Sequence, residues 1–432
     1  MFITLLISLI IISVFIASIL FFPSVVFKGH TIKIYSFIPI IGAILLILFN
    51  KIEFFRILSA FSENTSVNPL KILVLFLSMT TFSLVLEQTG FFAYISSALL
   101  KKAGSSQLLI FISFYLVISL LTIFTSNDII ILTFTPFICH FCKSAKVDPL
   151  PYLIMEFVAA NTWSLLLIIG NPTNIYLCSA FDIGFMPYLK TMLLPTVFAG
   201  LSSLLVMLII FGKKLLAPMC ECEEHGEITD KPVMMISLIH LLVCVVMLAI
   251  SQYIAVEMWI ISLIVALSEI ISVSICLLAE KKSFAPLKNG LMGMPFEIIP
   301  FIVGMFIIVL ALENSGITNA IESALKPYPD IFTYGYLSFL SANVVNNIPM
   351  SVLFSKILTS TETVSLGGVF ATVIGSNIGA FLTPVGALAG IMWSNLLRKN
   401  GIKITFLQFI KYGAVIGVAS VSAALCGLYF VI

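Results

Sequence analysis

The chain has 432 residues, of which 60% are hydrophobic and only 10% are charged. This apolar content exceeds what a water-soluble fold of this length can bury. The formal net charge is +2, and no basic tail or patch indicates a nucleic-acid partner. Apolar stretches long enough to cross a bilayer, about 20 residues each, recur along the whole chain, so the composition predicts a multi-pass protein of the cell membrane.

The first apolar segment, 2–22, is too long for the core of a signal peptide and lacks both a basic leader and a clear cleavage site. We therefore expect it to be a retained transmembrane helix. The eight cysteines are scattered, and several lie in apolar stretches, where they behave as small hydrophobic residues. No disulfide framework, redox role or cofactor is expected.

Each half of the chain shows the same order of segments: three spans, a short amphipathic segment, a two-armed segment, a long broken helix and a closing span. In the first half these are 2–22, 34–50, 70–88, 91–101, 106–142, 150–182 and 188–211. In the second half they are 233–252, 257–279, 294–313, 317–327, 331–358, 364–397 and 405–431.

The two halves also align residue by residue. Residues 79–99 parallel 305–325 without a gap, which places Glu87 on Glu313, and 161–171 parallel 377–387, which places Gly170 on Gly386. We therefore predict two repeats, 1–211 and 233–432, joined by a cytoplasmic linker, 212–232.

The two-armed segments decide the relative orientation of the repeats. If 106–142 is an inward re-entrant hairpin and 331–358 an outward one, each half has five transmembrane helices, and the odd number inverts the second repeat. The basic residues then gather on one side, which is the cytoplasm by the positive-inside rule. They are Lys101, Lys102, Lys143, Lys146, Lys213, Lys214, Lys281, Lys282, Lys288, Arg398, Lys399 and Lys403. Lys51 and Arg56 are exceptions. The predicted fold is an all-α polytopic membrane protein of two inverted repeats, each with a hairpin and a broken helix.

Small polar and helix-breaking residues interrupt the apolar helices at four places. These are Thr125–Asp128, Gly170–Asn174, Asn343–Pro349 and Thr383–Gly386, two at hairpin tips and two within long helices. Any one break can be a simple kink. Unpaired backbone groups at membrane depth are nevertheless costly unless protein or a water-filled cavity satisfies them, and four breaks at matching repeat positions favour a transport site.

Asp128 is the only charged residue between Gln107 and Phe141, and its repeat partner is the neutral Asn347. An ionisable group within the membrane indicates function. We expect Asp128 to exchange a proton or to bind a cation, although a carboxylate satisfied by neighbouring donors is the alternative. Glu156, inside the broken helix 150–182, is a second candidate for proton coupling. Glu87 and Glu313 are expected at helix ends instead.

The segment Cys220–His225 contains soft ligands that could capture a thiophilic metalloid. Two cysteines and a histidine in so short a stretch do not define a metal site, so a solvated acidic loop is favoured. His240 lies on an apolar helix, where a packed or hydrogen-bonded role is favoured over ligation.

The four breaks resemble those of the ArsB/NhaD branch of the ion transporter superfamily. The shared motifs are Asn127-Asp128, Ala160–Ser164 leading to Gly170–Asn174, Asn346–Pro349 and Leu382–Gly386. The resemblance spans essentially the whole chain. It implies a scaffold domain and a transport domain, often in a homodimer. In ArsB members it implies extrusion of arsenite or antimonite in exchange for protons, sometimes with a cytosolic ATPase subunit, and in NhaD members sodium/proton exchange.

By this resemblance the breaks supply the residues that bind the substrate or ion. They are Thr125, Ser126, Asn127, Asp128, Asn161, Asn171, Thr173, Asn174, Asn343, Asn346, Asn347, Asn377, Thr383 and Gly386. The paired Ser-Asn-Thr motifs of dicarboxylate relatives are absent, which argues against a sodium/dicarboxylate carrier. Family members often carry Thr-Pro before Gly170, where this chain has Ile168-Ile169, so the first broken helix is expected to differ in outline.

The side chains at the breaks also bear on the substrate. They include no Lys or Arg, so a neutral hydroxylated solute such as arsenous acid is favoured over a multiply charged anion. A sodium/proton antiporter using Asp128 with amide and hydroxyl oxygens remains the alternative, and an anion carrier is less favoured. An enzyme is disfavoured because no Ser/His/Asp arrangement or paired His is present. A channel would be distinguished from a carrier by the absence of counterflow.

Overall fold

The computed structural model describes residues 1–21, 25–27, 30–63, 68–103, 106–219, 226–251, 253–359 and 364–432. The Cys220–His225 loop therefore lies outside the described residues. The elements of the first half are α1 (Phe2–Phe21), β1 (Val25–Phe27), β2 (His30–Ile32), η1 (Ile34–Ser36), α2 (Ile38–Leu48), α3 (Phe54–Ser62), α4 (Pro69–Gln88), α5 (Phe91–Ala103), α6 (Gln107–Phe124), α7 (Asn127–Ser144), α8 (Pro149–Trp163), η2 (Ile168–Gly170), α9 (Pro172–Ala180) and α10 (Phe185–Leu215).

The second half contains α11 (Lys231–Ala249), α12 (Met258–Ala279), α13 (Ala285–Met292), α14 (Ile298–Asn314), α15 (Ile317–Leu325), α16 (Asp330–Val345), α17 (Asn347–Thr359), α18 (Leu366–Ile378), η3 (Gly379–Phe381), α19 (Leu388–Lys399) and α20 (Phe406–Tyr429). The predicted helical membrane fold is confirmed. A small departure is the antiparallel pair β1 and β2, with three residues in each strand.

Seven helices among the described residues are long and apolar enough to cross a membrane, or eight if the bent pair α14 and α15 counts as one span. The axes of that pair differ by 74°. The predicted span 34–50 is instead the short η1 followed by an 11-residue α2, because Pro39 and the preceding turn delay the helix start. The inversion of the repeats and the five crossings in each half stay predictions.

Local sequence explains where several helices begin. Asn68, Asp148 and Asn171 each precede a proline at the first helical position, and each side chain accepts a hydrogen bond from the backbone N–H two residues further on. This arrangement caps the helix while the proline occupies a position whose N–H needs no partner. The caps place the starts of α4, α8 and α9 unambiguously.

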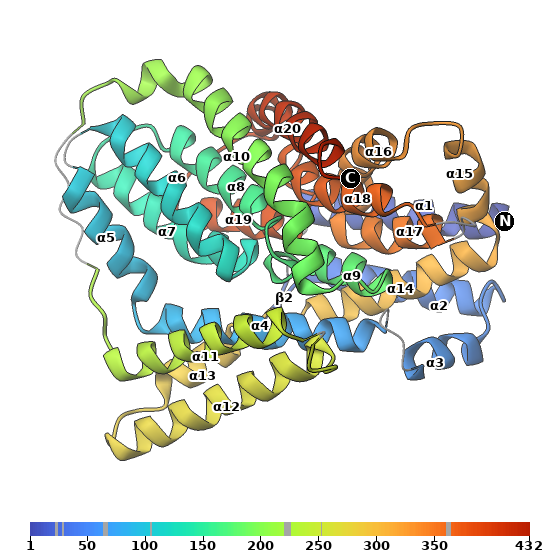
Figure 1. Ribbon diagram of the computed structural model, residues 1–432, viewed down its shortest axis with the longest axis horizontal. Helices are drawn as coiled ribbons and strands as arrows, with labels where there is room; N and C mark the ends of the chain where they lie inside the picture. The colour runs from blue at the N-terminus through green and yellow to red at the C-terminus, as the bar shows by residue number, and fades with distance from the viewer. Residues whose placement is uncertain are drawn as a thin grey trace.

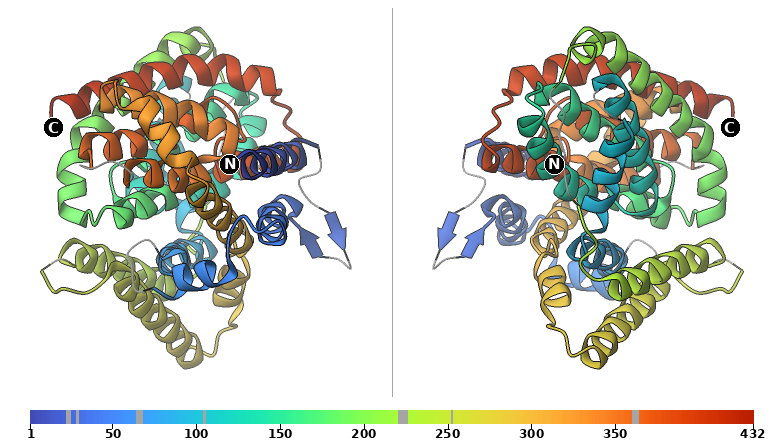
Figure 2. Two further views of the ribbon diagram at one scale, coloured as in Figure 1. Left: turned by 90° about the vertical axis from the view of Figure 1, so that its right-hand side faces the viewer. Right: turned by 90° about the vertical axis from the view of Figure 1, so that its left-hand side faces the viewer.

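The helices form two groups (Figure 1). Helices α11, α12 and α13 pack with α4 on one side of the molecule, and α2 packs between α1 and α14. Helices α6 to α9 and α16 to α19 form the other group, and α10 runs along α20 on its outside. The side views in Figure 2 show the two groups stacked one above the other. The family resemblance predicts a scaffold domain and a transport domain, and the assignment of these two groups to those roles stays a prediction.

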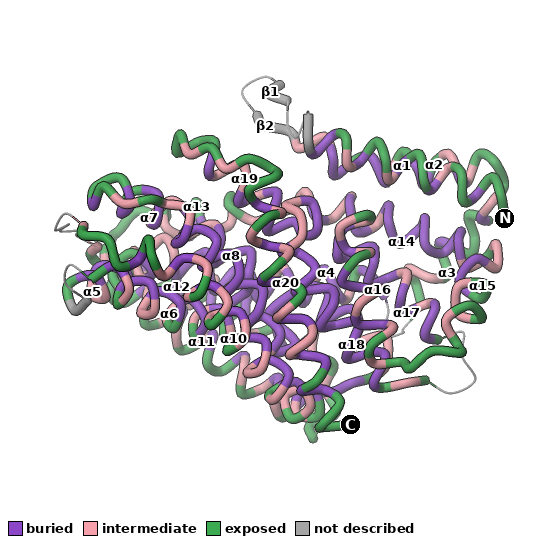
Figure 3. Tube along the Cα trace, turned by 90° about the horizontal axis from the view of Figure 1, so that it is seen from above, coloured by how far each residue is buried: buried purple, intermediate pink, exposed green. Residues whose placement is uncertain are grey.

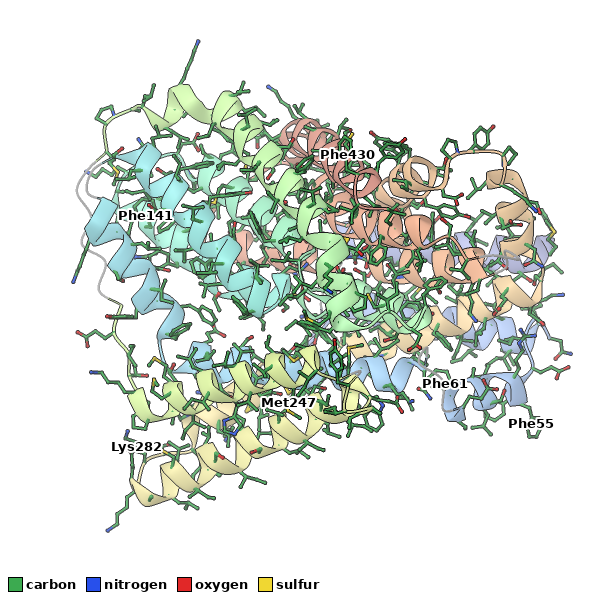
Figure 4. All side chains as sticks on the ribbon, in the orientation of Figure 1. Phe55, Phe61, Phe141, Met247, Lys282 and Phe430 are labelled. Carbon is green, nitrogen blue, oxygen red and sulfur yellow. The ribbon has the colours of Figure 1, made fainter. Side chains whose placement is uncertain are left out.

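Burial separates the central helices from the peripheral ones (Figure 3). Every residue of α18 from Gly367 to Ile378 is buried, whereas Leu201, Leu205 and Ile209 on α10 are exposed. Figure 4 shows the ring of Phe55 at the edge of the molecule, while Phe141 is fully buried. Exposed apolar side chains on a hydrophobic helix match a lipid-facing surface, and a helix buried all round belongs to the protein core.

Several loops that carry the predicted cytoplasmic lysines lie at one end of the molecule. The Gln107 side chain donates to the Ala217 carbonyl over 2.9 Å. Lys214 pairs with Asp148 over 2.6 Å, and Lys282 pairs with Asp230 over 2.9 Å. These contacts join the start of α6, the residue that caps α8 and the loop after α12 to the described parts of the linker. Their sidedness in the membrane stays a prediction.

Three charged or polar residues lie where the sequence predicts. Glu87 and Glu313 are in the last turns of α4 and α14. Glu313 pairs with Lys356 over 3.3 Å. His240 is hydrogen-bonded through its ring to the Ile236 carbonyl and to Ser268, so the expected structural role of this histidine is confirmed.

Candidate functional site

All four predicted interruptions are breaks between helices. Helix α6 ends at Phe124 and α7 begins at Asn127, while α16 ends at Val345 and α17 begins at Asn347. The broken helices pass through short 3-10 segments, η2 and η3, before α9 and α19 begin. Each break therefore leaves a new helix N-terminus inside the protein.

These four N-termini meet at one small cavity of about 10 Å³. Its lining residues are Asn127, Asp128, Asn171, Pro172, Asn347, Ile348, Ala387, Leu388 and Ala389. Each break contributes residues to the wall. A cavity of this volume accommodates about one water molecule, so the site is nearly closed.

The cavity has an unusual electrostatic character because four helices point their N-termini at it. Each N-terminus presents free backbone N–H groups and a partial positive charge. Asp128, in the first turn of α7, is the one ionisable residue among the described residues of the wall. The arrangement suits oxygen atoms of a solute together with a single exchangeable proton on Asp128.

Asn377 on α18 ties the two broken helices together. Its Oδ1 accepts hydrogen bonds from Ser164 Oγ over 2.9 Å and from Asn171 Nδ2 over 2.8 Å. Its Nδ2 donates to Asn174 Oδ1 over 2.7 Å. Thr173 joins the same network by accepting from Ser376 Oγ over 3.0 Å. Because all of these side chains are buried, the network satisfies polar groups that lipid or apolar packing could not.

The hairpin tips are fastened to the broken helices in a similar way. Asn127 Nδ2 donates to Asn161 Oδ1 over 2.9 Å, and Asn346 Nδ2 donates to the Val385 carbonyl over 2.9 Å. The Asn347 backbone N–H donates to the Gly386 carbonyl over 2.9 Å. Asn347 Oδ1 is buried with no hydrogen-bond partner among the described residues. It lies in the cavity wall, so it is available to a ligand.

Asn346 at the second hairpin tip has φ 71° and ψ 152°, a backbone conformation that is almost exclusive to glycine. Such a residue costs on the order of 1–3 kcal/mol and persists only where its surroundings hold it. Here the hydrogen bond from its side chain to Val385 supplies that hold. This conformation supports the prediction of a functional position at the tip between α16 and α17.

The predicted site residues divide into two sets. Asn127, Asp128, Asn171 and Asn347 line the cavity. The remaining predicted residues lie behind the wall and hold the breaks in shape: Thr125, Ser126, Asn161, Thr173, Asn174, Asn343, Asn346, Asn377, Thr383 and Gly386. Binding of substrate by either set stays a prediction.

Glu156 does not line the cavity. It is fully buried on α8, and its Oε1 accepts a hydrogen bond from Thr135 Oγ1 over 2.7 Å. Its Oε2 has no hydrogen-bond partner among the described residues. A carboxylate in this position connects α7 with α8, and its role in proton coupling stays a prediction.

Sequence reasoning missed the apolar part of the wall, which includes Pro172, Leu388 and Ala389. Apolar side chains do not by themselves indicate a binding site. The position of these three residues does indicate one, because each is among the first residues of a helix that follows a break. Counting forward from the four breaks would have found them.

Gly170 gives a first test of how tightly the breaks are packed. A Cβ added there would lie 2.3 Å from the Ser164 carbonyl oxygen, which is backbone and cannot move aside. We expect Gly170→Ala to lower the unfolding temperature and to abolish transport. The matched control is Gly212→Ala on α10, where nothing lies within 4 Å of the added methyl group. Equal behaviour of the two variants would contradict the packing described.

The fold is that of a polytopic α-helical membrane protein, in which four breaks between helices meet at one cavity. The citrate transporter family, CitMHS, matches residues 31–370, and the chain belongs to that family. It is a multi-pass membrane transporter.

Curated relatives carry more specific names. The chain is 25% identical over 358 residues to an arsenical pump membrane protein of Escherichia coli, covering 79% of this chain and 81% of the relative. It is also 25% identical over 388 residues to a 46 kDa membrane protein of Mycobacterium leprae, covering 85% and 87%. These matches confirm the predicted resemblance to arsenical pump proteins.

A solved structure shares the fold. The YdaH transporter of Alcanivorax borkumensis superposes with a TM-score of 0.58 over 99% of this chain and 97% of that chain, at 12% identity. At this identity the likeness concerns the arrangement of helices alone.

Proposed function

We propose that the protein exports arsenite or antimonite across the cell membrane in exchange for protons. The observation that carries the proposal is the cavity at which four helix N-termini and one carboxylate meet without any cationic side chain in the described wall. The arsenical pump relatives support the same choice.

Arsenous acid is a neutral solute with three hydroxyl groups. Its oxygens can accept hydrogen bonds from the N–H groups of the helix ends, and its hydroxyls can donate to asparagine oxygens such as Asn347 Oδ1. No lysine or arginine is needed for such a ligand. Asp128 then supplies the group that is protonated when the solute leaves and deprotonated when the solute binds.

An anion carrier is the second candidate, because four positive helix ends stabilise negative charge and the matching family is described as citrate transporters. The same helix ends repel a bare sodium ion, so the sodium/proton antiporter becomes the weaker alternative. A homodimer and a cytosolic ATPase subunit are further parts of the proposal that the resemblance supplies.

The test is uptake into everted membrane vesicles with an imposed proton gradient and no ATP. Arsenite, citrate and sodium are offered separately, and vesicles lacking the protein serve as the control. We expect the gradient to drive arsenite accumulation. Citrate accumulation would favour the second candidate, and sodium-dependent proton release without arsenite movement would overturn the proposal.

A further inference from the structure

Asp128 borders a second cavity in addition to the one at the four breaks. This cavity also has a volume of about 10 Å³. Its lining residues include Tyr35, Asp128, Pro295, Glu297, Phe301 and Leu388. Asp128 therefore stands between two spaces, each large enough for about one water molecule.

The second cavity is built by parts of the chain that are distant in sequence. Tyr35 belongs to η1 in the first half, Glu297 directly precedes α14 in the second half, and Asp128 is on α7. The Glu297 carboxylate forms an ion pair with Lys33. Lys33 and Glu297 are the charged side chains that act electrostatically on Asp128, and Tyr35 is influenced by both carboxylates.

The exposed fraction of the side chain falls from the ion pair to Asp128 and Tyr35. The side chains of Lys33 and Glu297 are 31% and 24% exposed, whereas Asp128 is 8% exposed and Tyr35 is 2% exposed. The ion pair is thus partly exposed at the surface, whereas Asp128 is buried. The cavity connects the two positions.

We propose that Glu297, held at the cavity mouth by Lys33, relays protons between bulk water and Asp128. In the inward step the Glu297 carboxylate first takes a proton from a hydronium ion of the bulk water. The Glu297 carboxyl then gives this proton to a water in the cavity as that water passes one of its own protons to an Asp128 oxygen, which restores the carboxylate paired with Lys33. The reverse sequence discharges Asp128. The Tyr35 hydroxyl lies along this path, where it can donate a hydrogen bond to the transferring water.

The relay rests on the proposed function, because it assigns a route for the coupling proton. The competing interpretation is that Lys33 and Glu297 merely clamp η1 to α14. If the ion pair only holds η1 against α14, loss of Lys33 and loss of Glu297 should have the same effect on transport. If Glu297 relays protons, its carboxylate is essential, whereas Lys33 only positions that carboxylate.

The test compares Glu297→Gln, Glu297→Asp and Lys33→Gln in membrane vesicles. Two readouts are taken: arsenite accumulation driven by a proton gradient, and counterflow of labelled against unlabelled arsenite without a gradient. During counterflow the protein carries arsenite in both directions, so no net proton transfer is needed. The matched control is Glu257→Gln, which removes another carboxylate paired with a lysine, Lys71, at 2.5 Å but away from Asp128.

We expect Glu297→Gln to leave counterflow unchanged. It should lower gradient-driven accumulation by about tenfold or more, which is a smaller loss than the roughly 100-fold expected when the group that carries the coupled proton is itself removed. Glu297→Asp should keep most accumulation, Lys33→Gln should lose less than Glu297→Gln, and Glu257→Gln should match wild type.

Unchanged accumulation in Glu297→Gln would overturn the relay. Equal losses of accumulation and counterflow in Glu297→Gln and Lys33→Gln would also overturn it, in favour of the clamp. Failure of the wild type to accumulate arsenite would instead overturn the proposed function, so the two failures are distinguishable.

Discussion

Replacing Asp128 by asparagine is expected to reduce proton-driven arsenite accumulation by about 100-fold or more, the scale on which loss of a proton-transfer group is felt. The substitution preserves the shape of the side chain and removes the only ionisable group in the described wall of the cavity. Without the Asp128 carboxyl, the described wall of the cavity has no group that can take up or release the coupled proton. Accumulation in everted vesicles measures the effect.

The matched control is Asp330→Asn. Asp330 is also in the first turn of a hairpin helix, α16, but it is exposed and lies at the far end from the break. We expect this variant to transport as the wild type does. Full activity of Asp128→Asn with a normal amount of protein in the membrane would show that Asp128 is a structural carboxylate, which is the alternative that the sequence leaves open.

Asn377→Ala is expected to destabilise the protein strongly. The substitution removes one hydrogen-bond partner from each of Ser164, Asn171 and Asn174. Asn171 Nδ2 loses the partner that it has in the structure, at a cost of about 1–3 kcal/mol, whereas Ser164 Oγ keeps the Asn161 carbonyl and Asn174 Oδ1 keeps Thr173. With about 1 kcal/mol for each of the other two lost hydrogen bonds, the combined loss is a few kcal/mol. Thermal unfolding of the purified protein in detergent should show a clearly lower midpoint, together with lost transport.

Asn400→Ala is the control for this effect. The Asn400 side chain donates to the carbonyl four residues earlier, as that of Asn377 does, but Asn400 is exposed and ends α19. Its removal should leave the midpoint unchanged. Should Asn377→Ala unfold at the wild-type temperature, the network between α8, α9 and α18 would not hold the site together.

Much of the fold follows from the sequence because lipid imposes strong rules on it. Apolar length located the long helices, and the polar and helix-breaking residues at Asn127, Gly170, Asn346 and Thr383 located the four breaks. The segment expected at 34–50 consists of η1 followed by the short α2, and hydropathy does not register the turn between them. Hydropathy also did not indicate the short hairpin of β1 and β2, because three residues are too few to show whether apolar residues alternate as in a strand.

The partnerships within the site could not be predicted in the same way. Asn377 lies more than 200 residues from Ser164 and from Asn171 in sequence, and no local pattern pairs them. Tyr35 and Glu297 approach Asp128 from two other elements. Their residue types are common at helix ends, so only the packing of the two halves shows that they face the same carboxylate.

Locating bound antimonite tests most directly whether the solute binds where the four helix N-termini meet. Antimonite scatters electrons strongly, so a structure of the purified protein in lipid nanodiscs with saturating antimonite would show where it binds. We expect the cavity, which has room for about one water molecule in this nearly closed form, to widen around the ligand. Density should then lie between the four helix N-termini, within hydrogen-bonding reach of Asn171 and Asn347. Density at another position, or an empty cavity in protein shown to bind antimonite, would contradict it.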